Sequence, residues 1–237
     1  MKAMILAAGL GARMRPLTDS CPKPLLKANG KALIDYHLER LAAWGISEVV
    51  INTHWLSDQV QEHISTNWRD KFKVHVLEEL DLLETAGGIV NALPILDNPN
   101  DEPFLVINGD IFFDADLKTW LNNTTKDKLP ALAHLLLCAN PSHNKTGDFS
   151  LSAQQNDGDA IVTVESSNTH TYSGIGLFRP SMFRDLAPGK RALGPILKQL
   201  ALERTIHASE LYGYWLDVGT PERLGALEKH IQDSAQS

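Results

Sequence analysis

The sequence predicts an α/β fold in which a mixed, mostly parallel sheet carries helices on both faces. From the N-terminus to about residue 140, short apolar runs alternate with amphipathic stretches, the pattern of repeated strand–helix–strand units. After residue 140, short strands follow one another with polar connections, which suits hairpins or the edge of a mixed sheet. The 237 residues contain no long linker and no internal repeat, so we expect a single domain over residues 1–237.

In the first part of the chain, strands are indicated by short apolar runs and helices by apolar residues at helical spacing. Gly45 is placed to end the first helix, Ser57 to cap the second and Pro94 to end the third. The expected strands are Ala3–Ala8, Glu48–Asn52, Val74–Glu78, Phe104–Asn108 and Ala131–Cys138. The expected helices are Ile34–Trp44, Ser57–Ile64, Ala86–Leu93 and Asp116–Leu121.

The second part of the chain is predicted from its turns, because glycine, proline and asparagine cluster between short runs of strand-forming residues. Pro221 stands at the first position of a terminal helix, where its missing N–H costs nothing. The turn-rich segments are Asn140–Gly147 and Gln154–Asp159. The expected strands are Phe149–Ser152, Ile161–Glu165 and Tyr172–Phe178, and the expected helices are Ser181–Leu186, Leu193–Leu202 and Pro221–Gln232.

Composition excludes several classes of protein. Hydrophobic residues make up 43% and charged residues 22%, as in an ordinary globular protein. The net charge of −7 argues against a nucleic-acid partner, which normally requires a basic face. The longest apolar run, Ala131–Ala139, falls well short of the ~20 residues that span a membrane. Cys21 and Cys138 form no C-x-x-C pair, so we expect a reduced, cytoplasmic protein that binds no membrane.

A glycine-rich loop follows the first buried strand and carries the first chemical signal. Gly9 and Gly11 allow the backbone to approach a ligand closely and to direct N–H groups at it. Arg13, Arg15 and Lys23 add positive charge nearby, which together with fixed N–H donors describes a cradle for a polyphosphate. The spacing matches neither the P-loop pattern nor, because its third glycine is absent, the dinucleotide fingerprint.

The segment GLGARMRPLT, residues 9–18, followed by PKPL, residues 22–25, resembles the signature of sugar-1-phosphate nucleotidylyltransferases. These enzymes join a sugar 1-phosphate to a nucleoside triphosphate, releasing pyrophosphate and a nucleotide sugar, and have a Rossmann-like fold. The resemblance implies that Arg15 holds the β- and γ-phosphates and that Lys23 contacts the reacting phosphates. It also implies that the loop and its surroundings bind the nucleotide through Ala8, Gly9, Gly11, Ala12, Arg13 and Asn108.

Two aspartates are candidate metal ligands and catalytic residues. Asp110 follows the apolar run FLVIN at the end of an expected strand, the edge where open α/β sheets bind ligands. Asp217 stands in WLDVGT, again before a glycine. Two such carboxylates can hold one Mg²⁺, with water and phosphate oxygens as the remaining ligands. Each aspartate alone is also an ordinary turn residue, but both motifs resemble the family's metal-binding motifs.

The nucleobase is expected at LETAG, residues 83–87, which resembles the family's base-reading turn. The resemblance implies contacts from Thr85 and Gly87, with assistance from Glu79. The sequence departs from the family at Glu84, where glycine is common. Close helix packing remains an equal explanation for the glycines that follow.

The sugar is expected in the second half of the chain, through Gly147, Asp148, Glu165 and Ser173. Glu165 stands where the family has Glu-Lys-Pro, and Ser166 replaces the lysine that binds the sugar phosphate, which disfavours the hexose thymidylyl and guanylyl branches. We therefore divide the domain into a nucleotide-binding half, about 1–140, and a sugar-binding half, about 141–220.

Within the family, the chain most resembles bacterial N-acetylmuramate-1-phosphate uridylyltransferases of cell-wall recycling. The implied partners are UTP and N-acetylmuramate 1-phosphate, in a Mg²⁺-dependent in-line displacement without a covalent intermediate. Lys145 and Arg191 are the cations expected near the lactyl carboxylate, although each is also explained as a solvated surface residue. Mannose-1-phosphate guanylyltransferase is the alternative enzyme, and a non-catalytic regulatory subunit of the same fold is the remote one. A monomer is favoured, and a dimer is not excluded.

Overall fold

The structure is a computed structural model that describes residues 1–126, 131–152, 160–165 and 168–235. The predicted turn Gln154–Asp159 and Ser166 lie outside the described residues. The chain divides into two compact units. Unit 1 comprises Met1–Leu83, Ile107–Asp114 and the segment from Tyr214 to the C-terminus, and unit 2 comprises Glu84–Val106 and Ala115–Gly213. The predicted division into nucleotide and sugar halves is a functional one and stays a prediction.

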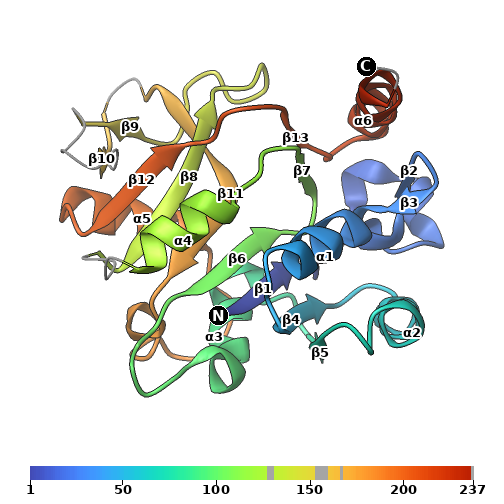
Figure 1. The fold of residues 1–237 in the computed structure, drawn as a ribbon, viewed down its shortest axis with the longest axis horizontal. Helices are drawn as coiled ribbons and strands as arrows, with labels where there is room; N and C mark the ends of the chain where they lie inside the picture. Colours follow the sequence, from blue (N-terminus) through green and yellow to red (C-terminus); the bar gives the residue numbers. More distant parts are fainter. Residues whose placement is uncertain (127–130, 153–159, 166–167, 236–237) are drawn as a thin grey trace. The chain divides into compact units, whose positions relative to one another are not determined.

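Unit 1 is built on parallel strands joined by helices. β1 (Lys2–Leu6) pairs with β4 (Glu48–Thr53), and β4 pairs with β5 (Lys73–Glu78), all in parallel. The connections contain α1 (Leu33–Ala43) and α2 (Ser57–Asn67), the latter packing near β5 (Figure 1). This is the strand–helix–strand pattern that the sequence predicted, and it places the ends of all three strands at one edge.

The helices of unit 1 follow from their apolar spacing, but one predicted cap is wrong. In α1, Ile34, Leu38 and Leu41 are fully buried at helical spacing, and Gly45, at φ 78°, follows its end as predicted. Ser57 does not cap α2, because the N-cap residue is Leu56, in the left-handed region at φ 52°. The Ser57 hydroxyl instead lies 2.8 Å from the Thr53 hydroxyl at the end of β4.

One hydrophobic cluster of unit 1 contains residues from both the N-terminal loop and the C-terminal helix. Its buried residues include Met14 from the N-terminal loop, Leu33, Phe112, Val218 and Leu227. Unit 1 also contains several short elements and a terminal helix. These are the 3₁₀ helices Ala12–Met14, Leu17–Asp19 and Lys23–Leu25, the hairpin of β2 (Lys27–Ala28) and β3 (Lys31–Ala32), the ribbon of β7 (Ile111–Phe113) and β13 (Trp215–Asp217), and α6 (Pro221–Ser234).

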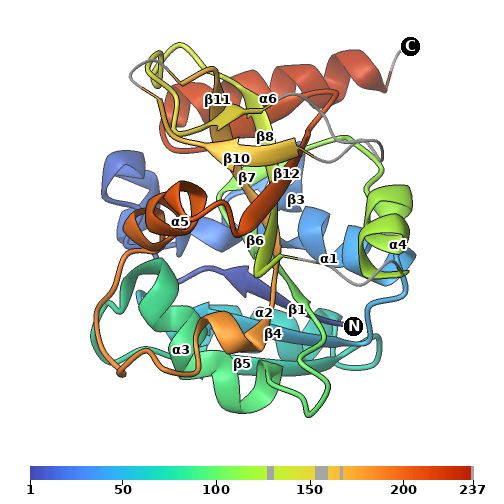
Figure 2. The same cartoon turned by 90° about the vertical axis from the view of Figure 1, so that its left-hand side faces the viewer.

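Unit 2 contains the mixed part of the sheet. β8 pairs with β12 in parallel, whereas the pairs β11–β8, β10–β12 and β10–β9 are antiparallel. α5 packs against β12 and β10 (Figure 2). The strands are β8 (Ala133–Ala139), β9 (Ser150–Leu151), β10 (Ala160–Thr163), β11 (His170–Phe178) and β12 (Ile206–Glu210), and the helices are α3 (Glu84–Leu96), α4 (Lys118–Lys126) and α5 (Leu193–Leu202).

The fold class predicted from the sequence is confirmed. β6 (Phe104–Asn108) is shared by the two units, and the strand order is β5-β4-β1-β6-β11-β8-β12-β10-β9. Two local predictions are wrong, and one strand was missed. Pro94 lies inside α3, the predicted helix Ser181–Leu186 is reduced to a 3₁₀ turn at Pro180–Met182, and the strand Ile206–Glu210 was not predicted. None of the described helices combines the length and apolar character needed to cross a membrane.

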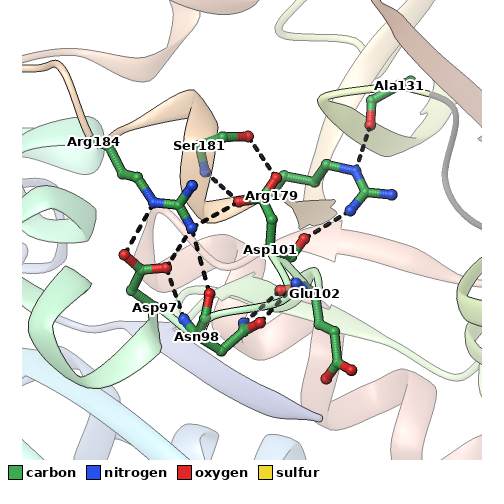
Figure 3. A network of polar contacts seen from close by, with 8 residues as sticks. All are labelled: Asp97, Asn98, Asp101, Glu102, Ala131, Arg179, Ser181 and Arg184. Carbon is green, nitrogen blue, oxygen red and sulfur yellow. Dashed lines mark hydrogen bonds and ion pairs between the residues drawn. The ribbon is translucent and has the colours of Figure 1, made fainter.

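A polar network in unit 2 ties the loop after α3 to the turn after β11 (Figure 3). The Asp101 carboxylate accepts hydrogen bonds from the backbone N–H and the hydroxyl of Ser181, at 2.8 and 2.7 Å, and pairs with Arg184 at 3.1 Å. The carbonyl of Asp101 accepts a 2.7 Å hydrogen bond from Arg179. Asp101 itself is in the left-handed region, at φ 54°. One aspartate therefore organises the whole turn.

We expect Asp101→Ala to lower the free energy of unfolding by about 1–3 kcal/mol, because Ser181 and Arg184 lose a shared acceptor. Asp101→Asn keeps an acceptor oxygen and tolerates the left-handed backbone, so it should cost less. Chemical denaturation of both variants measures the difference. Asp70→Ala serves as the control, because the Asp70 side chain is 95% exposed. Equal losses for the two Asp101 variants would contradict this role of the carboxylate.

Candidate active site

The loop after β1 folds back on itself around Gly11. The carbonyl of Gly11 accepts hydrogen bonds from the Met14 backbone N–H and the Thr18 hydroxyl, both at 2.8 Å. Met14 is fully buried and anchors the loop on the hydrophobic cluster of unit 1. Arg13 and Arg15, on either side of Met14, are exposed. The loop thus holds two arginine side chains at the surface from a backbone fixed by its own hydrogen bonds.

Gly9 and Gly11 are glycines for different reasons. Gly11 has φ +63°, and a Cβ there would lie 2.8 Å from Cγ2 of Thr18, so the packing of the protein itself requires glycine. A Cβ on Gly9 would meet nothing within 4 Å, and its φ lies outside the left-handed region. The backbone at Gly9 is therefore open to a close approach from outside. Its neighbours Ala8 and Ala12, also predicted to bind the nucleotide, are 9% exposed and exposed, respectively.

Lys23 and Asp110 form a largely buried ion pair. The Lys23 Nζ lies 2.7 Å from Oδ2 of Asp110, and the two side chains are 10% and 40% exposed. The turn before Asp110 is tied to β1, because the Gly109 N–H donates a 2.8 Å hydrogen bond to the Leu6 carbonyl. Asn108, predicted to contact the nucleotide, is half-buried at the end of β6. Lysine is seldom buried without a partner, and here the partner is the predicted metal ligand.

The second predicted acid lies beside the first. β13 pairs with β7 so that Asp217 stands opposite Ile111, the residue after Asp110. The Val218 N–H donates a 2.7 Å hydrogen bond to the Asp110 carbonyl. The sequence placed the two acids at separate strand ends, and the structure brings those ends together in one two-stranded ribbon.

Arg223 also belongs to this cluster, and the sequence analysis missed it. Its guanidinium contacts the Asp217 carboxylate and donates a 3.1 Å hydrogen bond to the Asp217 carbonyl. A Cβ built on Gly219 would lie 3.2 Å from both Nη2 of Arg13 and Oδ1 of Asp217, so these two side chains both border Gly219. Burial and the charge of Arg13 lower the pKa of Arg223. The available signal was a basic residue in the first turn of a helix, just after Asp217.

The cluster combines the cations Arg13, Lys23 and Arg223 with the carboxylates of Asp110 and Asp217. Such a set can bind an anion and still supply hard oxygen ligands to a cation. Within the described ranges, no group of three or more His, Cys, Asp or Glu side chains could hold a metal ion. Mg²⁺ is commonly bound through one or two carboxylates, with water and phosphate oxygens completing its shell, so this pair of acids fits the ion.

Arg15 stands apart from these contacts. Its side chain is 67% exposed, and its Nε lies 3.3 Å from Oδ1 of Asp19. An exposed pair of this kind contributes little to stability, because water screens it and both side chains lose freedom. The predicted contact of Arg15 with phosphates stays a prediction.

Glu79 is buried and already engaged at both carboxylate oxygens. Oε1 accepts a 2.7 Å hydrogen bond from the Asn52 side chain, and Oε2 accepts one from the Leu83 N–H at 3.1 Å. Asn52 in turn accepts a 2.9 Å hydrogen bond from the Ala7 N–H. Glu79 was predicted to assist in reading the base. That role stays a prediction, and the contacts of Glu79 in the structure fix the loop that leads to residue 83.

The predicted base-reading turn continues into α3. Glu84, where glycine is common in the family, adopts φ 59°, so the backbone there has the conformation that favours glycine. The N–H groups of Ala86 and Gly87 donate to the carbonyl of Arg191, at 2.9 and 3.1 Å. Thr85, the residue before Ala86, is half-buried. Arg191, predicted to meet the sugar, thus caps the start of α3 through its backbone.

The predicted sugar loop is held by side-chain amides. Gly147 has φ +63° and packs against Asn140, whose oxygen would lie 2.7 Å from an added Cβ. The Asp148 carboxylate accepts hydrogen bonds from the Tyr172 N–H at 3.0 Å and from Asn144 at 3.3 Å. Lys145, between them in sequence, is exposed. The loop is therefore ordered by its own contacts, with a lysine at its surface.

The two remaining sugar residues differ in exposure. Glu165 is exposed, and its backbone N–H donates a 2.8 Å hydrogen bond to the Asn168 side chain. Ser173 is fully buried, and its hydroxyl donates a 2.7 Å hydrogen bond to the Leu136 carbonyl. It lies at a shift of register between Tyr172 and Ile175 in β11, an irregularity typical of strands near binding sites. A contribution of Ser173 to sugar binding would have to pass through the backbone of this bulge.

Comparison with known proteins assigns the chain to a family. Residues 2–234 match the nucleotidyl transferase family, and the chain belongs to that family. It is 43% identical over 228 residues to an N-acetylmuramate alpha-1-phosphate uridylyltransferase of Neisseria meningitidis, covering 94% of this chain and 95% of the relative. A Caulobacter vibrioides protein of the same name is 32% identical over 246 residues, with 98% and 97% covered.

A solved structure agrees in fold. A candidate glucose-1-phosphate thymidylyltransferase from Bacillus anthracis, in complex with sucrose, superposes with a TM-score of 0.82 at 21% identity, covering 98% of this chain and 96% of that one. The chain is thus an enzyme of the sugar-1-phosphate nucleotidyltransferase class, and the family resemblance and fold predicted from the sequence are confirmed.

We expect Gly9→Ala and Gly11→Ala to differ in stability. Gly11→Ala forces a Cβ into Thr18 at a left-handed backbone position, which should lower the free energy of unfolding by roughly 1–3 kcal/mol. Gly9→Ala meets open space and should leave stability within about 0.5 kcal/mol. Thermal and urea unfolding of both variants measure this. A clear destabilisation by Gly9→Ala would contradict the assignment of Gly9 as open backbone.

Proposed function

We propose that this enzyme transfers uridylyl from UTP to N-acetylmuramate 1-phosphate, forming UDP-N-acetylmuramate and pyrophosphate. The observation that carries the proposal is the 43% identity, over nearly all of both chains, to a relative with that name. The second relative supports it with the same name at 32% identity. The reaction belongs to cell-wall recycling, and we propose that the enzyme works in the cytoplasm as a monomer, without nucleic acid or membrane.

The reaction needs no nucleophile from the protein. A phosphate oxygen of the sugar phosphate attacks the α-phosphorus in line, and the bond to the departing pyrophosphate breaks. Burial raises the pKa of Cys21 and raises that of Cys138 to about 12, so neither thiol is poised to attack. The protein has to position two anionic substrates and neutralise their charge, for which arginine, lysine and backbone N–H groups are suited.

The charge cluster supports this assignment of roles. Lys23 is buried and paired with Asp110, and it would turn to the reacting phosphates. Arg13, Arg15 and the open backbone at Gly9 would receive the triphosphate. Asp110 and Asp217 would hold Mg²⁺, which supplies charge neutralisation on the phosphates when bound. Arg223 would keep the Asp217 carboxylate in place.

We propose that the sugar half recognises the lactyl carboxylate that distinguishes N-acetylmuramate from N-acetylglucosamine. A buried carboxylate needs a cation or several N–H donors. Lys145 is the better supported candidate, because it is exposed and lies two residues before Gly147 in the predicted sugar loop. Arg191 is the second candidate, and its carbonyl is held by the N–H groups of Ala86 and Gly87 at the start of α3.

Pyrophosphate release from a panel of substrates tests the substrate proposal. UTP with N-acetylmuramate 1-phosphate should give the highest kcat/KM among pairs that include N-acetylglucosamine 1-phosphate and mannose 1-phosphate, each with UTP and GTP. A higher value for GTP with mannose 1-phosphate would replace the substrate proposal with the guanylyltransferase alternative. No release from any pair would favour the regulatory subunit.

Asp110→Asn and Asp217→Asn should each lower kcat by about 10²-fold or more, because each removes a charge from the group that stabilises the transition state. Both variants keep their size and a hydrogen-bond acceptor for Lys23 or Arg223, so the fold should stay intact, and the midpoint of thermal unfolding should fall because the cation loses its counter-charge. Steady-state kinetics at saturating Mg²⁺ and calorimetry measure the two effects. Asp70→Asn, at an exposed position, is the control. Near-normal turnover in either variant would exclude that aspartate as a metal ligand.

A further inference from the structure

A buried chain of three hydrogen bonds crosses unit 1 from β1 to the loop after β5. Asn52 and Glu79 are each 3% exposed. The Ala7 N–H donates to Oδ1 of Asn52, Nδ2 of Asn52 donates to Oε1 of Glu79, and the Leu83 N–H donates to Oε2 of Glu79. The distances along the chain are 2.9, 2.7 and 3.1 Å. Each acceptor oxygen of the two side chains therefore faces a defined donor.

The register of the parallel strands creates this arrangement. Asn52 in β4 stands opposite Leu6 of β1, and Thr53 stands opposite Glu78 of β5. Asn52 thus lies at the carboxyl edge of β4, between β1 and β5; its register partners are Leu6 and Leu77, so Ala7 is one residue further along β1 and Glu79 two residues further along β5. A side chain at this register position can reach both neighbouring strands at the point where they become loops.

Both ends of the chain of hydrogen bonds enter predicted nucleotide-binding segments. Ala7 directly precedes Ala8 and Gly9, where the triphosphate is expected. Leu83 is the first residue of the turn expected to read the base. The backbone of Glu79 is fixed as well, because its N–H donates to the Thr53 carbonyl at 2.7 Å and its carbonyl lies 2.7 Å from Nδ1 of His54.

The stability of the fold alone does not explain why a buried Asn–Glu pair stands here. A buried carboxylate is costly to desolvate, and apolar side chains of similar volume often serve a core as well or better. What a network of fully satisfied polar groups does well is to fix two backbones at one spacing. A nucleotide that is bound at both its phosphates and its base needs the two binding segments at a fixed distance. A small displacement of one segment weakens the combined binding strongly.

We propose that Asn52 is a positioning residue for the nucleotide, and that the Asn52–Glu79 pair sets the spacing between the triphosphate loop and the base-reading turn. This inference rests on the proposed function, since it takes UTP as the molecule that spans the two segments. In this arrangement Glu79 acts through the Leu83 backbone, and its carboxylate makes no contact with the base.

The pair can be broken and rebuilt by exchanging an amide and a carboxylate. N52D keeps the acceptor for Ala7 but sets two carboxylates against each other. E79Q can still accept from Asn52, but it turns an N–H₂ group toward the Leu83 N–H. In N52D/E79Q the new carboxylate accepts from both Ala7 and the new amide, whose oxygen accepts from Leu83. The double variant restores all three hydrogen bonds with the middle one reversed.

Equilibrium binding of UTP, inorganic tripolyphosphate and uridine to the full-length chain tests the proposal. We expect N52D and E79Q to weaken UTP binding by about tenfold or more, with a much smaller effect on either fragment. N52D/E79Q should recover most of the UTP affinity. In turnover assays the single variants should raise KM for UTP more than they lower kcat, and KM for the sugar phosphate should stay unchanged.

N98D is the matched control, because Asn98 also bridges backbone groups, accepting from the Glu102 N–H and donating to its carbonyl, in unit 2. Equal weakening of UTP and tripolyphosphate, or a double variant no better than its parents, would overturn the positioning role. If one single variant fails to fold, the other single variant and the double variant still decide. A wild-type chain that binds GTP but not UTP would reject the proposed substrate, and the same variants would then be compared with GTP.

Discussion

The ion pair between Lys23 and Asp110 joins parts of the chain that are 87 residues apart. It forms because Gly109 ties the end of β6 to β1, and because the Val218 N–H donates to the Asp110 carbonyl. With these contacts in place, the loop after β1, the turn after β6 and the β13 strand meet at one location. The side chains that can handle phosphate and a divalent cation are assembled there as a result.

The same site shows how opposite charges stabilise one another when both are partly removed from water. Lys23 without Asp110 would be a buried, unpaired cation, and Asp217 without Arg223 would be a half-buried, poorly compensated anion. Paired charges of this kind are held ready at little net cost, and an arriving phosphate or metal ion can exchange partners with them. The charged side chains of the cluster are therefore already oriented by one another.

The sequence predicted the parts of this structure that depend on local pattern. Apolar spacing located α1 and α5 closely, and the apolar runs located β1, β4, β5 and β6. It failed where tertiary contacts override propensity. Pro94 continues α3, and β12, IHASE, has too few apolar residues to stand out until β8 pairs with it.

The residues of the candidate site likewise fall into those that sequence motifs predicted and those that they did not. Gly9, Gly11, Lys23, Asp110 and Asp217 belong to short motifs that a reader can recognise in the chain. Arg223 and Asn52 belong to no motif, because their roles come from strand register and from the packing of α6. Ser173 was selected from its neighbours in sequence, yet the bulge in β11 turns its hydroxyl into the sheet. The alternation of residues along a strand does not predict where a side chain points when the strand contains a bulge.

The distribution of the charge cluster along the chain has a consequence for biosynthesis. Its members are Arg13, Lys23, Asp110, Asp217 and Arg223, so the cluster draws on residues that are synthesised at widely separated times. A nascent chain acquires the glycine-rich loop early, but Lys23 meets its carboxylate partner only after β6 has emerged, and Asp217 its guanidinium partner only after the first turn of α6. Incomplete chains therefore carry the most recognisable motif of the enzyme without the electrostatic centre that motif serves.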